Sequence, residues 1–198
     1  MRKSADIRKT EIVAAVMDMA DKIGPDRVTT AAVANVVGVT QAALFRHFST
    51  KSDLWVAVAE SISIKLTAAW EEAVAGNQTP SERLRALVLS QLSQIEQAPA
   101  LPMLLFSREL NVENEELRQA FSSRLAAFHS MLAKEFAAGQ SSKVFRQAIK
   151  ADDAAMLLTS LIQGLAIRWS LGARNFNFQQ EGKRLLNINL GLLSNEEG

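Results

Sequence analysis

The side chains best suited to contact a polyanion lie close together in the stretch GVTQAALFRHFSTK, residues 38–51. Arg46, His47 and Lys51 stand there among a leucine and two phenylalanines. A buried segment would not carry so many basic or titratable groups, and a solvated one would not need two phenylalanines. The stretch is therefore predicted to be a short element with one apolar side and one basic side.

The polar side of this stretch has the chemistry needed to read DNA bases. If Leu44 and Phe48 face inward, five residues face outward. These are Gln41, Ala42, Ala43, Arg46 and His47. Glutamine can pair with adenine and arginine with guanine through two hydrogen bonds each, and an alanine methyl group can pack against a thymine methyl group.

Helices must position these residues, because the sequence has almost no strand signals. No Val/Ile/Thr alternation of useful length and no Asn-Gly turn occurs, whereas helical periodicity appears almost everywhere. About nine helices are predicted, over residues 5–23, 29–38, 40–48, 49–75, 83–97, 103–110, 113–138, 152–172 and 180–193. The fold class is therefore all-α.

The first three predicted helices have the layout of a helix-turn-helix, a long helix followed by two short ones joined by Gly38 and Val39. The second short helix of this motif enters the major groove. Val33, Val36 and Val37 are predicted to form the inner side of the first short helix. Three threonines at the starts of the short helices, and one lysine after them, are suited to phosphates. They are Thr29, Thr30, Thr40 and Lys51.

The motif resembles the DNA-binding signature of TetR-type transcriptional repressors. The matching residues are Thr29, Val33, Ala34, Val37, Gly38, Val39, Thr40, Leu44, Phe45, Arg46, His47, Phe48, Lys51 and Leu54. The match covers about residues 7–55 of the chain. It implies an N-terminal helix-turn-helix DNA-binding domain, residues 1–50, and a helical effector-binding and dimerisation domain, residues 51–198.

By this resemblance, ten residues are expected to approach bases or phosphates. They are Thr29, Thr30, Thr40, Gln41, Ala42, Ala43, Phe45, Arg46, His47 and Lys51. Phe45 departs from the family, which usually has tyrosine there, so the hydroxyl bond to the DNA backbone is lost and only apolar contact remains. Ala42 stands where relatives often have glycine or proline, which is a mild change.

The distribution of charge is consistent with a polyanion partner for the N-terminal part. Residues 1–51 contain eight Lys/Arg and five Asp/Glu, a net charge of +3, which leaves −2 for the rest of the chain. Such asymmetry suits nucleic acid. Arg2, Lys3, Arg8 and Lys9 form either a solvated tail or an arm for the minor groove, and both readings remain open.

The remainder of the sequence contains no catalytic constellation. The chain has no cysteine, no Gly-rich phosphate loop and no nucleophile elbow, and His129 has no acidic partner at metal-ligand spacing in the sequence. The acidic pairs Glu115–Glu116 and Asp152–Asp153 are typical of helix starts. We therefore expect neither an enzyme nor a protein with a metal or cofactor.

The resemblance also implies a pocket for a small-molecule effector between the C-terminal helices. The candidates are Trp70, Met103, Phe106, Arg108, Phe121, Phe128, His129, Gln163 and Trp169. An apolar cavity with few polar groups is typical of such sites. The alternative, that each aromatic or methionine side chain is simply core, remains open.

The last two helices, 152–172 and 180–193, carry more apolar surface than a monomer needs and are predicted to form a homodimer interface. Burial against the chain's own helices is the alternative. Gly164 suits a close approach of another helix. With no signal-peptide core and no run of 18 apolar residues, we expect a cytoplasmic protein without a membrane partner.

The sequence thus predicts a repressor that binds a pseudo-palindromic operator as a dimer and is released when a ligand shifts the fourth helix. Two alternatives stay open. One is a DNA-binding protein of the same fold with an architectural or division-linked role and no ligand. The other is a helical enzyme or adaptor whose N-terminal part only resembles the motif.

Overall fold

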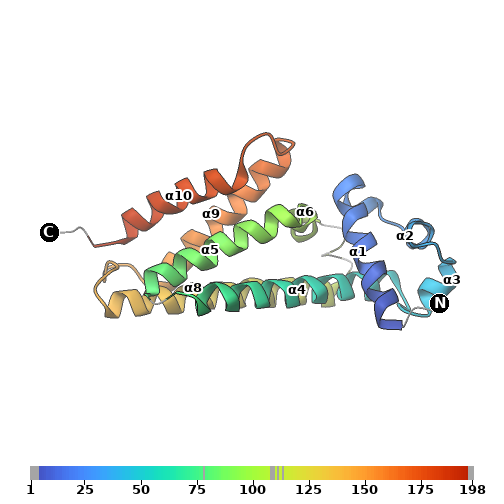
Figure 1. The fold of residues 1–198 in the computed structure, drawn as a ribbon, viewed down its shortest axis with the longest axis horizontal. Coiled ribbons are helices and arrows are strands. Elements are labelled where there is room, and N and C mark those ends of the chain that lie inside the picture. Colours follow the sequence, from blue (N-terminus) through green and yellow to red (C-terminus); the bar gives the residue numbers. More distant parts are fainter. Residues whose placement is uncertain (1–4, 78, 108–109, 111, 113, 196–198) are drawn as a thin grey trace. The chain divides into compact units, whose positions relative to one another are not determined.

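A computed structural model of the chain describes residues 5–77, 79–107, 110, 112 and 114–195 (Figure 1). Within these ranges, nine α-helices and one 3-10 helix account for nearly all regular structure. The only extended pairing in the described ranges is an isolated antiparallel bridge between Phe145 and Ser194. The all-α prediction is therefore confirmed.

The helices begin and end within about three residues of the predicted bounds, with one exception. They are α1 Ala5–Ile23, η1 Pro25–Arg27, α2 Thr30–Val37, α3 Gln41–Phe45, α4 Lys51–Ala75, α5 Pro80–Gln97, α6 Ala100–Phe106, α8 Glu115–Ser141, α9 Ala151–Leu171 and α10 Phe178–Leu193. The exception is α6, predicted at 103–110. It begins at Ala100, because Pro102 lies in the first turn, where a backbone N–H has no partner within the helix and its loss costs little.

The chain forms two compact units, which we describe separately. The head unit comprises Met1–Ile64 and Ala98–Ser122, and the body unit comprises Lys65–Gln97 and Ser123–Gly198. Helices α4 and α8 each contribute residues to both units.

In the head unit, α1 and α2 pack against each other, and their residues Ile12, Val16 and Val33 are fully buried. The predicted inner side of α2 is wrong at Val36, which is 58% exposed. Ala34 is buried beside Val33 instead. At about 100° per residue, residues 33, 37 and 34 follow one another around one side of the helix, and residue 36 lies outside that arc, beyond residue 33.

Two buried polar side chains join residues 98–122 to the rest of the head unit. Ser107 donates its hydroxyl hydrogen to Asp26 Oδ1 at 2.6 Å and accepts the Leu110 N–H at 3.2 Å. Asn114 caps α8 by accepting the Leu117 N–H at 2.9 Å and donates to the Ser52 carbonyl oxygen at 3.3 Å. The start of α8 is thereby bonded to the first turn of α4.

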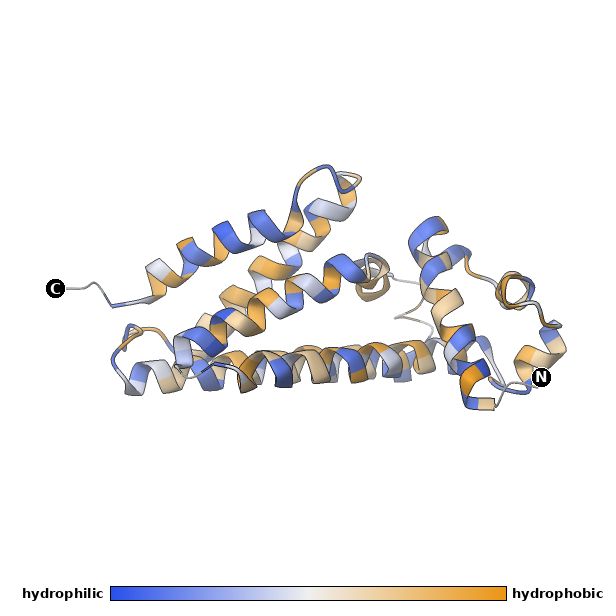
Figure 2. Cartoon of the chain, viewed as in Figure 1, coloured by the Kyte–Doolittle hydropathy of each residue, from blue (hydrophilic) through white to orange (hydrophobic). Residues whose placement is uncertain are grey.

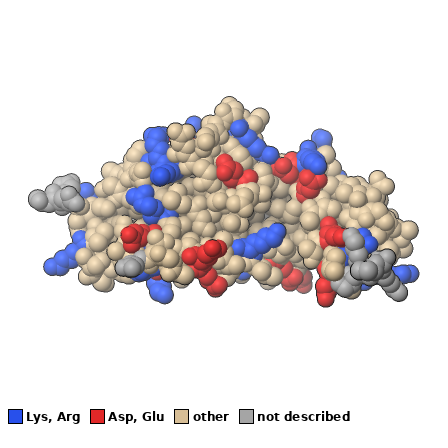
Figure 3. Space-filling model, viewed as in Figure 1, with Lys and Arg blue, Asp and Glu red and all other residues tan. Residues whose placement is uncertain are grey.

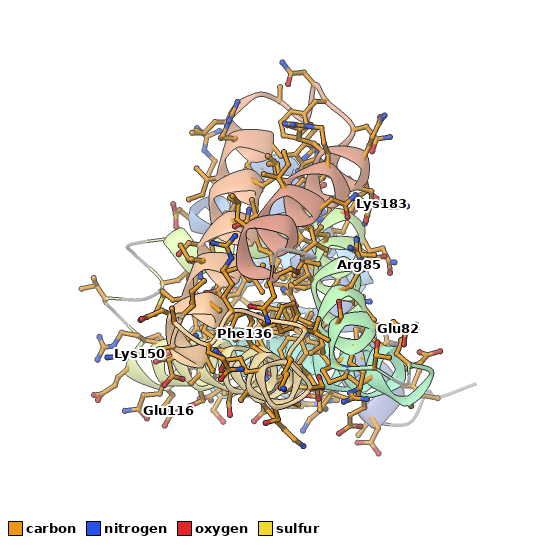
Figure 4. All side chains as sticks on the ribbon, turned by 90° about the vertical axis from the view of Figure 1, so that its left-hand side faces the viewer. Glu82, Arg85, Glu116, Phe136, Lys150 and Lys183 are labelled. Atoms are coloured by element: carbon orange, nitrogen blue, oxygen red, sulfur yellow. The ribbon has the colours of Figure 1, made fainter. Side chains whose placement is uncertain are left out.

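In the body unit, α5, α9 and α10 pack against one another, and hydrophobic residues alternate with hydrophilic ones along each helix (Figure 2). A side chain on Gly182 would overlap Leu92, so α10 lies very close to α5 at that point. Phe136 of α8 lies among the side chains of the interior, whereas Lys150 lies at the periphery (Figure 4).

Residues after α8 and after α10 are tied together at one end of the body unit. The Phe145 ring stacks on Phe136 at a centroid distance of 4.6 Å and fills the space where Gly139 has no side chain. Asn195 donates its side-chain N–H to the carbonyl oxygens of Lys143 and Phe145, at 2.6 and 3.2 Å.

Helix α9 is long and apolar enough, by length and composition alone, to cross a membrane, and it is the one such helix in the described part of the chain. Eight of its side chains, from Ala154 to Trp169, are buried inside the protein. The core helix of a soluble protein passes the same test. A helix that is apolar on most sides must bury those sides, and α9 buries part of them inside the protein.

Candidate nucleic-acid interface

The turn between α2 and α3 is fixed by a glycine and by backbone hydrogen bonds. Gly38 has φ +72°, a left-handed conformation that costs glycine little and other residues more. Its N–H donates to Asn35 O at 3.1 Å, and the Val39 N–H donates to Ala34 O at 2.9 Å. These bonds end α2 and direct the chain into α3.

Threonines cap both short helices, as the sequence predicts. The Thr29 hydroxyl oxygen accepts the Ala32 N–H at 3.2 Å, and that of Thr40 accepts the Ala43 N–H at 3.1 Å. A hydroxyl that accepts a cap can still donate its own hydrogen. Both side chains are exposed, so each can donate to a phosphate while capping its helix.

Leu44 and Phe48 hold α3 in place, and its other side faces solvent. Leu44 is fully buried and Phe48 nearly so. Ala43 and His47 are half-buried. The exposed residues of this segment are Thr40, Gln41, Ala42, Phe45 and Arg46. Leu44 and Phe48 therefore face inward as predicted, whereas Ala43 and His47, predicted to face outward, are only partly exposed.

A contact that the sequence did not reveal joins the starts of α2 and α3. Gln41 Nε2 donates to Thr30 Oγ1 at 2.8 Å, across eleven residues. The bond holds the Gln41 amide in one orientation, and the second amide hydrogen is left for another acceptor. No local spacing rule connects positions 30 and 41, so only the folded turn shows that the two residues act together.

Helix α4 begins with a capping box directly after this motif. The Thr50 hydroxyl accepts the Asp53 N–H and the Asp53 carboxylate accepts the Thr50 N–H, both at 3.0 Å. Lys51, the first residue of α4, is half-buried. The backbone that carries Lys51 is therefore fixed by its neighbours.

The basic residues before the motif divide into two groups. Arg8 and Lys9 lie in α1, and the Arg8 guanidinium contacts Glu11 at 3.1 Å and the Val37 carbonyl oxygen at 3.5 Å. Arg8 thus joins α1 to the end of α2. Arg2 and Lys3 lie outside the described residues. On the face in Figure 3, Lys/Arg and Asp/Glu side chains are interspersed, so no single uniform basic patch covers it.

The residues predicted to line an effector pocket are distributed over both units. Met103 and Phe121 belong to the head unit, and Trp70, Phe128, His129, Gln163 and Trp169 to the body unit. The Phe106 side chain and the whole of Arg108 lie outside the described residues. Trp70 and Phe128 are in contact, with ring centroids 4.9 Å apart, whereas Trp169 contacts Phe178.

Sequence reasoning missed two polar features of the body unit. His129 Nε2 lies 3.5 Å from Asp152 Oδ1, because the start of α9 folds beside the middle of α8. Among the residues that could be searched, no group of three or more possible metal ligands occurs. Arg124 Nη1 donates to Thr67 Oγ1 at 2.5 Å, and its guanidinium lies over the Trp70 ring.

Comparison with known proteins matches both parts of the chain to one family. A family model described as bacterial regulatory proteins, tetR family, matches residues 12–58, and one described as BetI-type transcriptional repressor, C-terminal, matches residues 80–187. The nucleoid occlusion factor SlmA of Marinomonas sp. is 28% identical over 164 residues, 83% of each chain.

Solved structures share the fold over nearly the whole chain. A TetR transcription regulator from Haloarcula marismortui superposes with a TM-score of 0.83 at 19% identity, covering 96% of this chain and 100% of that one. A protein from Saccharomonospora viridis, determined in complex with choline, superposes with a TM-score of 0.80 at 22% identity, covering 98% and 100%. The second family model alone spans more than half of the chain, and the helix-turn-helix agrees with the first, so this protein belongs to the TetR family of DNA-binding transcriptional regulators.

Proposed function

We propose that this protein is a ligand-responsive repressor that binds a pseudo-palindromic operator as a homodimer and is released by a small molecule. The observation that carries the proposal is the geometry of α2 and α3, in which a buried Leu44 and Phe48 leave the opposite side of α3 free for DNA. Helix α3 enters the major groove.

The proposed DNA contacts fall into two classes. Gln41, Ala42, Ala43, Phe45, Arg46 and His47 approach the bases, and Thr29, Thr30, Thr40, His47 and Lys51 approach phosphates. The hydrogen bond from Gln41 to Thr30 supports this assignment, because it fixes the orientation of the exposed Gln41 amide in the absence of DNA. The division into a DNA-binding domain, residues 1–50, and an effector-binding and dimerisation domain, residues 51–198, is part of the same proposal.

The proposed dimer interface is formed by α9 and α10. Several large apolar side chains of these helices are exposed on the chain itself. They are Met156, Leu157, Leu171, Ile188 and Leu192. A Cβ atom added at Gly164 or Gly191 would meet no described atom within 4 Å. None of the chain's own described helices therefore makes a close approach to Gly164. A second copy supplies that approach, and the two α3 helices then reach major grooves about 34–36 Å apart.

The proposed release mechanism acts through α4 and α8. Lys51 is the first residue of α4, and Asn114 bonds the start of α8 to Ser52. An effector bound among residues of the body unit that lie on these helices, such as Trp70 and Phe128, shifts them and alters the spacing of the half-sites. Coupling of this kind is reciprocal, so operator DNA weakens effector binding by the same factor.

The effector site is proposed to include three further candidates of the body unit, His129, Gln163 and Trp169. Because the Saccharomonospora viridis protein was crystallised with choline, choline is one compound to test here.

A regulator of this kind works in the cytoplasm, where its operator lies, and needs no membrane.

A second candidate function is favoured by the relative from Marinomonas sp., which is named a nucleoid occlusion factor. In this alternative the protein binds DNA with an architectural or division-linked role and needs no small molecule. Failure of every small molecule to release the DNA, or salt-sensitive binding without sequence preference, favours this alternative.

The decisive experiment is selection of bound duplexes from a random DNA pool by the purified protein at near-physiological salt. Recovery of an inverted repeat supports the dimeric regulator. Salt-sensitive binding without sequence preference contradicts it, because the protein would then contact only the DNA backbone. Release of the selected duplex by small molecules distinguishes the repressor from the ligand-independent factor.

A further inference from the structure

Arg124 is a half-buried cation of the body unit whose hydrogen bonding is incomplete. Its Nη1 donates to Thr67 Oγ1 of α4 at 2.5 Å, and its Nε is buried without a hydrogen-bond acceptor. Within the described part of the chain, no carboxylate lies within ion-pair distance of Arg124. Arg83, another half-buried arginine of the same unit, bonds Glu135 at 2.7 Å.

This arrangement leaves one edge of the guanidinium able to bind an anion. The Nε–H and an Nη2–H lie on the edge away from Thr67 and can donate two parallel hydrogen bonds to one carboxylate. A buried donor without an acceptor is costly, so the folded chain gains when an anion supplies both acceptors. An arginine that only covers the core with its aliphatic part keeps its guanidinium in water, whereas the Nε of Arg124 is buried without a hydrogen bond.

The surroundings of Arg124 add an aromatic surface. The guanidinium carbon lies 5.8 Å from the centroid of the Trp70 ring, and Trp70 contacts Phe128. Trp70 is 2% and Phe128 4% exposed, and Trp70 Nε1 is held by Gln91 Oε1 at 2.9 Å. Arg124 therefore has rigid, buried apolar rings on its inner side.

We propose that Arg124 binds the anionic group of the effector, and that the effector is an organic carboxylate with an apolar portion packed near Trp70 and Phe128. This inference rests on the proposed ligand response and names its chemical class. A quaternary ammonium is disfavoured here, because it would approach a like charge already placed on the Trp70 ring.

The position of Arg124 gives such a ligand a route to the DNA-binding end of the chain. Its hydrogen-bond partner, Thr67, is part of α4, and Arg124 itself is part of α8. A carboxylate that draws the guanidinium toward itself alters the bond to Thr67. Helix α4 begins at Lys51, and α8 begins at the residue after Asn114. Near these two starts, the Asn114 side chain donates a hydrogen bond to the Ser52 carbonyl oxygen of α4.

The test compares matched carboxylates and amides by isothermal titration calorimetry on the full-length chain. The probes are benzoate and benzamide, indole-3-acetate and indole-3-acetamide, octanoate and octanamide, with choline as the cationic probe. We expect at least one carboxylate to bind, with its amide about tenfold or more weaker, which corresponds to the loss of charge-assisted hydrogen bonds.

Variants assign the effect to the guanidinium. Arg124→Gln is expected to weaken the bound carboxylate about tenfold or more, and Arg124→Lys, which keeps the charge without the forked geometry, by an intermediate factor. Arg118→Gln, on the same helix but exposed, is the matched control and should leave binding unchanged. If Arg124→Gln fails to fold, Arg124→Lys and the carboxylate–amide pairs still decide the question.

Two outcomes overturn the inference: no carboxylate of the panel binds, or carboxylates bind equally to the wild type, Arg124→Gln and Arg124→Lys. Release of the selected operator, followed by fluorescence anisotropy, separates this result from the proposed function. Arg124-dependent binding without release supports the site and contradicts the ligand-responsive repressor. If choline releases the operator and no carboxylate binds, the proposed carboxylate site at Arg124 is contradicted, and the proposed function as a ligand-responsive repressor still holds.

Discussion

At the scale of single residues, the exposed side of α3 combines side chains that read bases with side chains that contact phosphates. Gln41 is held by Thr30, and Thr40 caps the helix while its hydroxyl hydrogen is available. Residues of the first kind determine sequence preference and residues of the second kind determine overall affinity, which gives each a different signature in binding measurements.

Gln41→Ala and Arg46→Ala are expected to relax sequence preference, whereas Lys51→Ala should weaken all DNA about equally. Each lost base contact costs about 1–3 kcal/mol of discrimination, and loss of one phosphate contact reduces the salt slope by about one unit. Binding of the selected operator and of point-mutated operators, measured at several salt concentrations, checks both. Unchanged selectivity in both Gln41→Ala and Arg46→Ala would contradict the assigned register of α3.

Phe45→Tyr is expected to increase affinity for operator and non-operator DNA alike. The Phe45 ring is 39% exposed, so a hydroxyl at its tip can reach solvent or a phosphate without burying a polar group. One new hydrogen bond contributes about 0.5–1.5 kcal/mol, or about two- to tenfold in Kd. Anisotropy titrations check the change, and a decrease in affinity would show that the ring packs against DNA instead.

The residue scale is also where sequence reasoning was least complete. The caps at Thr29 and Thr40 and the turn at Gly38 were predictable, because each depends on neighbours within three or four residues. The bonds from Gln41 to Thr30, His129 to Asp152 and Arg124 to Thr67 join positions far apart in the chain. No local spacing encodes such contacts, so only the folded structure reveals them.

At the scale of helices, most boundaries followed from periodicity, glycine and proline. The predicted start of α6 is wrong because proline ends most helices but is accepted in a first turn, where Pro102 lies. The error at Val36 arose because Ala34, a small residue, occupies the inward position that a larger apolar side chain was expected to fill.

Gly38→Ala is expected to destabilise the head unit by about 1–2 kcal/mol. The cost comes from the left-handed backbone at φ +72°, since an added side chain would meet nothing within 4 Å. Gly76→Ala is the matched control, because that position is equally open and has no positive φ. Thermal unfolding of both variants checks the difference, and equal midpoints would show that the turn relaxes without strain.

At the scale of the whole molecule, the proposed homodimer depends on the surfaces of α9 and α10. Exposed apolar residues on α9 and α10, and open space at Gly164 and Gly191, support association through these helices. Residues 157, 164 and 171 are spaced by seven and therefore lie on one side of α9, which suits packing against a second helix pair.

The double variant Leu157→Glu, Leu171→Glu is expected to be monomeric and to bind the operator at least about tenfold more weakly than the wild type, because charged side chains would be buried at the interface. Ile64→Glu is the control, since Ile64 is 70% exposed, between Leu157 at 52% and Leu171 at 83%, but lies on α4. Sedimentation equilibrium measures the oligomeric state. A variant that remains dimeric would place the interface elsewhere.

Three successive helices of the head unit begin with a threonine that closes their first turn: Thr29 for α2, Thr40 for α3 and Thr50 for α4. Because these starts are complete before DNA arrives, operator binding requires no coupled folding of the recognition elements. The heat-capacity change of association should then follow from the dehydration of contact surface alone, without the larger decrease that accompanies segments that order on binding. Association should likewise proceed in a single kinetic phase whose rate rises linearly with DNA concentration.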